Sequence, residues 1–397
     1  MRVVLAFSGG LDTSWCIPIL LNQGHEVVTV TVDVGGFSEV EQQEICERSQ
    51  ILGAKSHVWI QAEDKFFDQM IRFLIAGNVL RGGTYPLCVG AERSLQAQEV
   101  AKIAKQVEAD AVCHGCTAAG NDQFRFETAF RTYAPGMEIL APVRDETPSR
   151  AKQLSDLLEM GVAFPAEKAA YSVNSGLWGV TIGGVETTGT HDSIPESAWQ
   201  RTRGAFDKFL EPRIHQLRFE QGVPSAFDGV EGCPVSVIKA VDAAAAQMGI
   251  GRGIHLGETI LGIKGRVAFE APAASVILQA HRELEKLTLT KREISLKDFV
   301  AAQYGDWIHE GLGTDPAARH AEALFESSQR HVTGTVHLLF RQGLCFVTGV
   351  DSPYSLHAAS KAVYGESVGE WEADDARGFA KIYGLPSVIH ARTEVPL

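Results

Sequence analysis

The chain has 397 residues, of which 45% are hydrophobic and 21% charged, and its formal net charge is −13 at pH 7. This length predicts more than one domain, and the acidic balance argues against a nucleic-acid partner, because proteins that bind nucleic acid present a basic face. The sequence shows no signal peptide and no apolar run long enough to cross a bilayer. Its seven scattered cysteines favour a reducing compartment. We therefore expect a cytoplasmic protein with no membrane partner.

The first half of the chain alternates apolar, β-branched runs with helical patterns. The expected strands cover 2–7, 26–34, 56–61 and 109–113, and the expected helices cover 13–21, 39–52, 66–80 and 92–108. This alternation predicts an α/β fold with a doubly wound parallel sheet, which binds ligands at the carboxyl ends of its strands.

From about residue 165 the pattern changes to that of a mixed, α+β second domain. Glycine-rich turns are expected at 183–184 and 251–257, and a strand-like run at 236–239. Helices are expected at 274–287 and 296–304, and residues 332–350 predict a hairpin that turns near Gly343. The acidic run 370–375 indicates a solvated helix start.

The strongest local signal is the segment SGGLDTS at residues 8–14, where the first strand turns into a helix. Two glycines allow close approach of the backbone to a phosphate, and a helix N-terminus offers free N–H groups. The segment lacks the lysine of a Walker A loop and is not a dinucleotide-binding turn. It resembles the pyrophosphate loop of the N-type ATP pyrophosphatases, which hold the β- and γ-phosphates while a nucleophile attacks the α-phosphorus.

A second motif, HGCTAAGNDQFRFE at residues 114–127, follows the strand that ends at Cys113. Asp122 can pair with an ammonium group and Arg125 can bind a carboxylate with two parallel hydrogen bonds, so the segment suits an amino acid. It resembles the HG[AC]TGKGNDQVRFE stretch of the argininosuccinate synthase family. The resemblance continues in YPL at 85–87, APVR at 141–144, LWG at 177–179, VTG at 332–334 and SPYSL at 352–356.

The resemblance implies an ATP-dependent ligase of arginine biosynthesis. It would join citrulline and aspartate through a citrulline adenylate, release AMP and pyrophosphate, require Mg²⁺ and form a homotetramer. The implied parts are a nucleotide-binding domain at 1–165, a synthetase and multimerisation domain at 166–375, and an oligomerisation segment at 376–397.

The resemblance also implies site residues, and none of them is assigned as a metal ligand. Ser8, Asp12 and Arg125 would be catalytic. ATP would contact Ala6, Phe7, Ser8, Gly9, Gly10, Leu11, Asp12, Thr13, Ser14 and Gly115, with Val32 at the adenine. Aspartate would contact Thr117, Asn121 and Asp122. Citrulline would lie among Tyr85, Arg93, Asn121, Arg125, Ser172, Thr181, Glu258 and Phe269.

The sequence departs from the family pattern mainly around the acceptor. A Gly-Lys pair is Ala118-Ala119 here, and a Thr-Ser pair is Val89-Gly90. The family's VENR segment is LGET at 256–259, and a tyrosine is Phe269. Either shifted residues such as Glu258 and Thr181 compensate for these losses, or the acceptor differs from citrulline.

Three alternatives stay open at this point. The chain could adenylylate a different ureido or amide acceptor, modify RNA as a tRNA thiolase of the same superfamily does, or bind nucleotide as a non-catalytic paralogue. The spacing of Cys113 and Cys116 suggests a metal or sulfur site only weakly, because no second ligand pair accompanies it. Cys113 is better interpreted as the last core residue of a strand.

Overall fold

The computed structural model describes residues 1–164 and 171–394. It divides into two compact units, Met1–Ser352 and Pro353–Leu397. Within the described residues, no helix has both the length and the apolar character needed to cross a membrane. The expected boundary between residues 165 and 166 lies outside the described residues, and the three expected parts stay a prediction.

A five-stranded parallel sheet forms the N-terminal part, in the order β3-β2-β1-β4-β5. Its strands are β1 (Arg2–Ala6), β2 (Glu26–Asp33), β3 (Ser56–Gln61), β4 (Ala111–Cys113) and β5 (Glu138–Leu140). After β1 the chain adds β2 and β3 on one side of the sheet and then β4 and β5 on the other. The strand order therefore reverses between β1 and β4. In open α/β sheets this reversal is where ligands bind.

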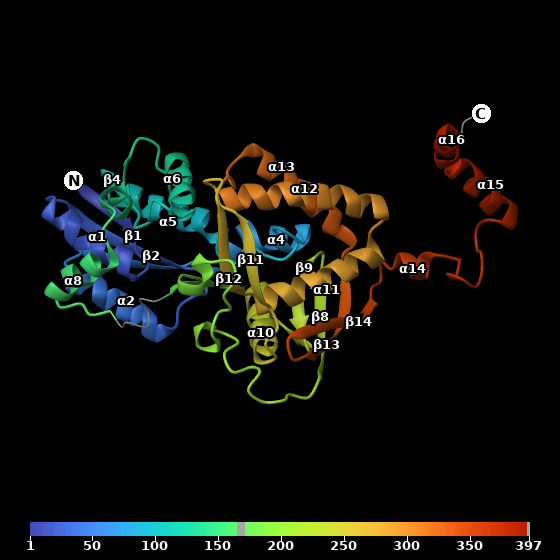
Figure 1. The fold of residues 1–397 in the computed structure, drawn as a ribbon, viewed down its shortest axis with the longest axis horizontal. Helices are drawn as coiled ribbons and strands as arrows, with labels where there is room; N and C mark the ends of the chain where they lie inside the picture. Colours follow the sequence, from blue (N-terminus) through green and yellow to red (C-terminus); the bar gives the residue numbers. More distant parts are fainter. Residues whose placement is uncertain (165–170, 395–397) are drawn as a thin grey trace. The chain divides into compact units, whose positions relative to one another are not determined.

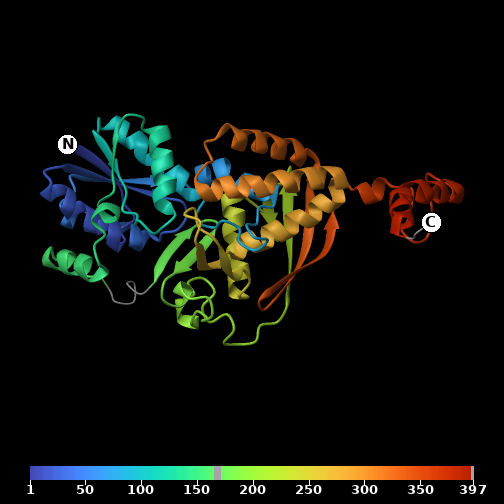
Figure 2. The same ribbon diagram turned by 45° about the horizontal axis from the view of Figure 1, so that its top comes forward.

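Helices cover both faces of this sheet, as the alternating pattern predicts. Val4 and Val28 pack in the core that includes Leu95 and Val100 of α5, whereas Val3 and Leu5 pack with Trp15 of α1. Figures 1 and 2 show the blue strands between α2 and α8 on one side and α5 and α6 on the other. The helices are α1 (Leu11–Asn22), α2 (Glu39–Ile51), α5 (Glu92–Gln106), α6 (Asp122–Tyr133), α7 (Pro142–Glu146) and α8 (Arg150–Glu159).

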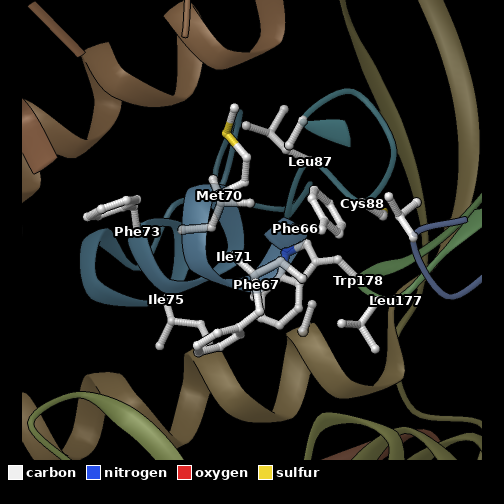
Figure 3. Close-up of a cluster of buried hydrophobic side chains, with 14 of the residues drawn as sticks. Phe66, Phe67, Met70, Ile71, Phe73, Ile75, Leu87, Cys88, Leu177 and Trp178 are labelled. Carbon is white, nitrogen blue, oxygen red and sulfur yellow. The ribbon is translucent and has the colours of Figure 1, made fainter. Parts of the chain in front are cut away.

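The helix expected at 66–80 is three short elements: α3 (Glu63–Phe66), a π-helical turn (Phe67–Ile71) and α4 (Arg72–Gly77). It ends at Asn78, whose φ of 48° is left-handed. Figure 3 shows the core that these elements form, where Phe66 and Phe67 lie close to Leu177 and Trp178. The Trp178 indole Nε1 donates to Pro86 O at 3.0 Å. The packing of Phe66 and Phe67 with Leu177 and Trp178 joins the N-terminal part of the chain to the part that follows it.

The remainder of the first unit contains two antiparallel sheets, which confirms the α+β prediction. One sheet has the order β11-β12-β7-β6 and the other β10-β9-β8-β13-β14. Their strands are β6 (Ser172–Gly176), β7 (Gly179–Gly183), β8 (Arg213–Glu220), β9 (Val223–Phe227), β10 (Val230–Glu231), β11 (Arg252–Glu258), β12 (Lys264–Glu270), β13 (Gly334–Arg341) and β14 (Leu344–Asp351). The helices are α10 (Pro234–Gln247), α11 (Pro272–Thr288), α12 (Lys291–Glu310) and α13 (Pro316–Ser328). The expected hairpin is β13 and β14, which turn at Gly343.

One expectation for this part was wrong, and another was confirmed only in part. Residues 236–239 lie inside α10, because Pro234 begins a helix there and the run packs its apolar side chains at helical spacing with Val241 and Ala245. Of the glycines of 251–257, Gly251 lies in a turn with a φ of 90°, as expected, whereas Gly253 and Gly257 lie in β11. At Gly253 a Cβ would meet the Phe269 ring, so this glycine makes room for a side chain on the neighbouring strand.

The hairpin of β6 and β7 docks against the carboxyl end of β2. Leu177 N donates to Val34 O at 2.8 Å, and a Cβ at Gly36 would collide with the backbone of Ser175. A surface of the second part therefore faces the ligand-binding edge of the parallel sheet.

The second unit contains α14 (Leu356–Ala359), α15 (Ala373–Tyr383) and α16 (Leu385–Glu394). The acidic run begins α15 as expected, with Glu372 at the N-cap and Asp375 completing the cap.

Candidate active site

A cleft of about 1800 Å³ opens where β1, β2 and β4 end. A pocket for one drug-sized ligand has a volume of roughly 300–1000 Å³, so this cleft has room for several substrates. Most of the residues singled out from the sequence line it. They are Ala6, Phe7, Ser8, Gly9, Gly10, Leu11, Asp12, Thr13, Val32, Tyr85, Arg93, Gly115, Thr117, Asn121, Asp122, Arg125, Ser172, Thr181 and Glu258.

The loop after β1 and the loop after β4 touch at the point of strand reversal. A Cβ at Gly115 would lie 2.9 Å from Thr13 Cγ2 and 3.1 Å from Thr13 N. Only a glycine permits this approach, which brings the two sequence motifs into a single site.

The phosphate loop adopts a conformation that requires glycine. Gly9 has a φ of 70°, and a Cβ there would lie 2.5 Å from Ile45 of α2. The Ser8 hydroxyl accepts from Gly10 N at 3.3 Å and lies 3.2 Å from the Thr13 hydroxyl. Gly10 begins α1 without a side-chain cap, so the N–H groups of the first helical turn stay available to an anion.

Asp12 and Ser14 differ in what they present to the cleft. Asp12 lines the cleft, and its Oδ1 accepts from Gln153 Nε2 of α8 at 2.8 Å, which fixes the carboxylate. Ser14 is fully buried and donates its hydroxyl to Gly9 O at 3.5 Å. Its side chain therefore stabilises the loop from the buried side.

Arg48 of α2 is a cationic group at the phosphate loop that the motif analysis missed. It donates to Gly9 O, and its guanidinium lies 4.8 Å from the centre of the Phe164 ring. Burial lowers the pKa of this guanidinium, which stays charged at neutral pH because its ordinary value is so high. Its signal in the sequence was that Arg48 is the only basic residue on an acidic helix.

Asp122 lies between two arginines at the start of α6. Its Oδ2 accepts from Arg93 Nε at 3.0 Å, and its Oδ1 accepts from Arg125 Nη1 at 2.6 Å. Burial alone would raise the pKa of this carboxyl, but the charges of Arg93 and Arg125 outweigh burial and hold the pKa well below its usual range. Asp122 is therefore a permanent anion.

Arg93 connects this ion pair to the second part of the molecule. Its Nη2 donates to Asn174 Oδ1 of β6 at 2.8 Å, and its Nη1 donates to Glu92 Oε1 at 2.6 Å. Glu92 is buried, which raises the pKa of its carboxyl to about 7. Its other oxygen faces Gly176 of β6.

Arg125 is held from the opposite side by the end of α12. Its Nε donates to His309 O at 2.7 Å, and its Nη2 lies 3.1 Å from His309 Nδ1. Gly90 leaves space for the guanidinium, since a Cβ there would lie 3.1 Å from Arg125 Nη2. The expected clamp on a substrate carboxylate is thus already bonded to protein groups at Nε, Nη1 and Nη2.

The loop between β4 and α6 is exposed in its middle and held at the end that precedes α6. Thr117, Ala118 and Ala119 are exposed. Asn121 Oδ1 accepts from Ile260 N at 2.9 Å, at the tip of the β11–β12 hairpin. The second part therefore holds the end of the loop that the sequence assigns to aspartate.

The remaining predicted residues come from the second part. Thr181 is 8% exposed and Ser172 begins β6 at the rim. Glu258 is exposed and pairs with Lys264 at 2.8 Å, and Phe269 is buried behind the Tyr85 ring at 5.3 Å. Phe269 therefore does not line the cleft, and the Glu258 carboxylate is already paired.

Cys113 is fully buried at the end of β4, as expected of a core residue. Across residues 1–164 and 171–394, no three His, Cys, Asp or Glu side chains gather as they would around a metal ion.

Comparison with known families decides between the alternatives. Residues 2–162 match the arginosuccinate synthase N-terminal HUP domain, and residues 171–390 match the arginosuccinate synthase C-terminal domain. The chain belongs to the argininosuccinate synthase family. It is 38% identical to the argininosuccinate synthases of Methanocaldococcus jannaschii and Methanopyrus kandleri, with 97–98% of each chain covered. It is 36% identical to that of Xanthomonas campestris pv. campestris, with 98% of each chain covered.

Membership in the argininosuccinate synthase family confirms the resemblance drawn from the two motifs, and it makes the chain an ATP-dependent ligase. The RNA-modifying and non-catalytic alternatives lose their basis, because the match spans both domains of the ligase. Argininosuccinate synthases join citrulline and aspartate in arginine biosynthesis.

Proposed function

We propose that this cleft joins citrulline to aspartate, consuming ATP and giving argininosuccinate, AMP and pyrophosphate through a citrulline adenylate. The observation that carries the proposal is the contact between Gly115 and Thr13. It places the pyrophosphate loop next to the Asp122–Arg125 motif, so that a nucleotide and an amino acid bind side by side.

ATP lies with its adenine at Val32 and its β- and γ-phosphates over the loop of residues 8–13. The N–H groups that begin α1 and the guanidinium of Arg48 face the negative charge of these phosphates. The citrulline ureido oxygen bonds to the α-phosphorus while the bond to the β-phosphate oxygen breaks, and pyrophosphate leaves with the electron pair. Charge accumulates on the leaving group, so these donors stabilise the transition state.

Aspartate lies at Thr117, Asn121 and Asp122, beside the open part of the β4–α6 loop. Its amine, after losing a proton, attacks the ureido carbon of the adenylate and displaces AMP. The permanent negative charge of Asp122 suits an ammonium ligand, and its side chain keeps 31% of its surface exposed for such a contact. Citrulline lies among Tyr85, Arg125, Ser172 and Thr181.

Mg²⁺ accompanies the nucleotide in this proposal. Magnesium is usually held by one or two carboxylates together with substrate phosphates, and Asp12 is the carboxylate within the phosphate loop. The ion would neutralise phosphate charge, and Gln153 orients the carboxylate for this purpose.

The proposal includes a cytoplasmic homotetramer. All seven cysteines are unpaired, as in a reducing compartment. In α15 the side chains of Phe379, Ile382 and Tyr383 are 65%, 73% and 76% exposed, an apolar face that assembly would bury. Sedimentation of the full chain should give the mass of four copies, and a stable monomer at micromolar concentration would contradict this assembly.

The test of the reaction is an assay of product release with purified enzyme, ATP and Mg²⁺. We expect AMP and pyrophosphate only when citrulline and aspartate are both supplied for turnover. Release of ADP and orthophosphate would refute the mechanism.

A further inference from the structure

A buried carboxylate at the start of α5 lines the cleft and lacks a partner for one of its oxygens. Glu92 is 1% exposed, and its Oε1 accepts from Arg93 Nη1 at 2.6 Å. Its Oε2 is also buried, and no donor among the described residues bonds to it. A buried carboxylate oxygen without a donor is costly, so a ligand that supplies N–H groups relieves this cost.

The unbonded oxygen faces the β6–β7 hairpin. A Cβ at Gly176 would collide with Glu92 Oε2, so only a glycine fits beside this oxygen. Gly179 lies opposite Gly176, and a Cβ there would lie 2.7 Å from Cys88 Cβ. The two glycines therefore bring the hairpin against residues 85–92, the segment that carries Tyr85 and Glu92.

The same face of the hairpin carries the hydroxyls assigned to citrulline. Successive side chains of a strand point to opposite faces, so Ser172, Asn174 and Gly176 share one face of β6. Thr181 pairs with Asn174 across the hairpin and lies on that face as well. Because a Cβ at Gly176 would point at Glu92 Oε2, this is the face that the carboxylate meets. Glu92 therefore adjoins the acceptor end of the cleft.

Glu92 Oε2 differs from the other carboxylate oxygens at this end of the cleft. Asp122 bonds to two arginines and is assigned to the ammonium group of aspartate. Glu258 pairs with Lys264 at the exposed rim. The family's VENR segment places its glutamate at position 257, where this chain has Gly257. Among the described residues at this end, Glu92 thus supplies the carboxylate oxygen that is both buried and unpaired.

We infer that Glu92 is a specificity-determining residue, whose Oε2 accepts a hydrogen bond from the α-ammonium group of citrulline. This inference rests on the proposed function, because it takes citrulline as the acceptor. An ammonium group carries three N–H donors, so it can bond to Oε2 while the hydroxyls of Ser172 and Thr181 accept from the others. Glu92, and not Glu258, then compensates for the carboxylate that is missing at position 257.

The charge of Glu92 depends on pH in the neutral range. Burial raises the pKa of its carboxyl to about 7, although Arg93 favours the ionised form. The charged groups around this carboxyl are Arg93 on α5, Asp122 on α6, Asp33 at the end of β2 and Arg201, which donates to Gly176 O at 2.6 Å. An ammonium group pairs with the ionised form, so below pH 7 a proton has to leave before citrulline binds. The KM for citrulline should therefore rise by up to about tenfold per unit as pH falls below 7.

The test compares citrulline with 5-ureidopentanoic acid, which lacks only the α-amino group, in the wild type and in Glu92→Gln. The full chain is supplied with ATP, Mg²⁺ and aspartate, and turnover is followed as argininosuccinate formed from citrulline. The inhibition constant of 5-ureidopentanoic acid against citrulline is measured in the same assay. We expect Glu92→Gln to raise the KM for citrulline at least about tenfold, because the charge that matches the ammonium is removed. The inhibition constant of the analogue should change less than about threefold.

Two outcomes with the analogue would overturn the inference. An equal loss of affinity for both compounds would show that Glu92 acts only by holding Arg93. Unchanged affinity for both compounds would show that no ammonium meets Glu92. If the wild type forms no argininosuccinate from citrulline, the proposed function itself fails, which separates the two conclusions.

Two further variants and the pH profile serve as controls. Glu92→Asp keeps the charge on a shorter side chain and should retain part of the preference for citrulline. Glu99→Gln, on the same helix, removes a carboxylate that pairs with Lys65 and Lys102 and does not line the cleft, so both constants should stay unchanged. The KM for ATP reports that each variant is folded. The rise of the citrulline KM below pH 7 should be present in the wild type and in Glu99→Gln and absent in Glu92→Gln, and a citrulline KM in the wild type that does not change across this range would overturn the inference.

Discussion

His309 Nδ1 lies 3.1 Å from Arg125 Nη2, and the carbonyl of the same histidine accepts from Arg125 Nε at 2.7 Å. One residue at the end of α12 thus holds two edges of a guanidinium on α6, 184 positions earlier in the chain. Arg125 keeps a fixed orientation toward Asp122 as a result, which prepares the cleft for its substrates before they bind.

The burial of His309 beside Arg125 and Arg81 makes stability depend on pH. Burial, followed by the charges of Arg125 and Arg81, lowers the pKa of His309 to about 3 from an ordinary value of 6.5. Between these values the unfolded chain binds a proton that the folded chain excludes. The free energy of unfolding should therefore fall as pH decreases below 6.5, by up to about 1.4 kcal/mol per pH unit for each such group.

Urea midpoints at pH 7 and pH 5 measure this effect in the wild type and in His309→Phe. Burial also lowers the pKa of His114 to about 4, so the variant should lose only part of the dependence. The exposed His320→Phe is the control and should match the wild type. If the urea midpoint changed by the same amount between pH 7 and pH 5 in His309→Phe and in the wild type, His309 would not be a source of the pH dependence.

Asp12→Asn should reduce kcat by roughly 100-fold, because it removes the one negative charge of the phosphate loop while keeping the side-chain shape. The measurement is pyrophosphate release at saturating substrates, with circular dichroism to verify the fold. Asp207→Asn, in an exposed loop, serves as the matched control. A kcat within a few-fold of the wild type would show that Asp12 has no role in the chemistry.

Arg48→Met should raise the KM for ATP roughly tenfold or more, because a charged hydrogen-bond donor is lost beside the phosphates. Arg48→Lys retains the charge and should recover part of the affinity. The exposed Arg341→Met should have no effect. If the Met and Lys variants show the same KM for ATP, the guanidinium acts through packing on Phe164 and not through charge.

Ala119→Lys should lower the KM for aspartate several-fold, because it adds a cation to an exposed loop next to the proposed aspartate site. The gain should shrink as salt is raised from 50 to 500 mM, since exposed charges are screened over roughly 10 Å at 0.1 M salt. Ala302→Lys, on the exposed side of α12, tests for a non-specific effect of charge. A gain that persists at high salt, or that Ala302→Lys reproduces, would rule out a local electrostatic role.

The sequence by itself determined the features that depend on local order. The alternation of apolar runs and helical patterns predicted the doubly wound sheet, because buried parallel strands are apolar on both faces. The two glycines before α1 predicted the phosphate loop, since residue 9 has a positive φ that glycine adopts readily. Short runs without their flanks were less informative. Residues 236–239 resemble a strand until Pro234 is recognised as the start of a helix.

The contacts that complete the cleft were decided only by the tertiary structure. Arg125 pairs with Asp122 at a spacing of three residues on one helix, which the sequence can indicate. His309 and Arg81 carry no motif, and they reach the same cleft because α12 packs on α4, which precedes the loop that carries Arg81. Glu258 lies near a motif and lines the cleft, and only the tertiary structure shows that its carboxylate pairs with Lys264. Local patterns report the spacing of residues along one element, whereas the partners of a buried charge depend on how distant elements pack.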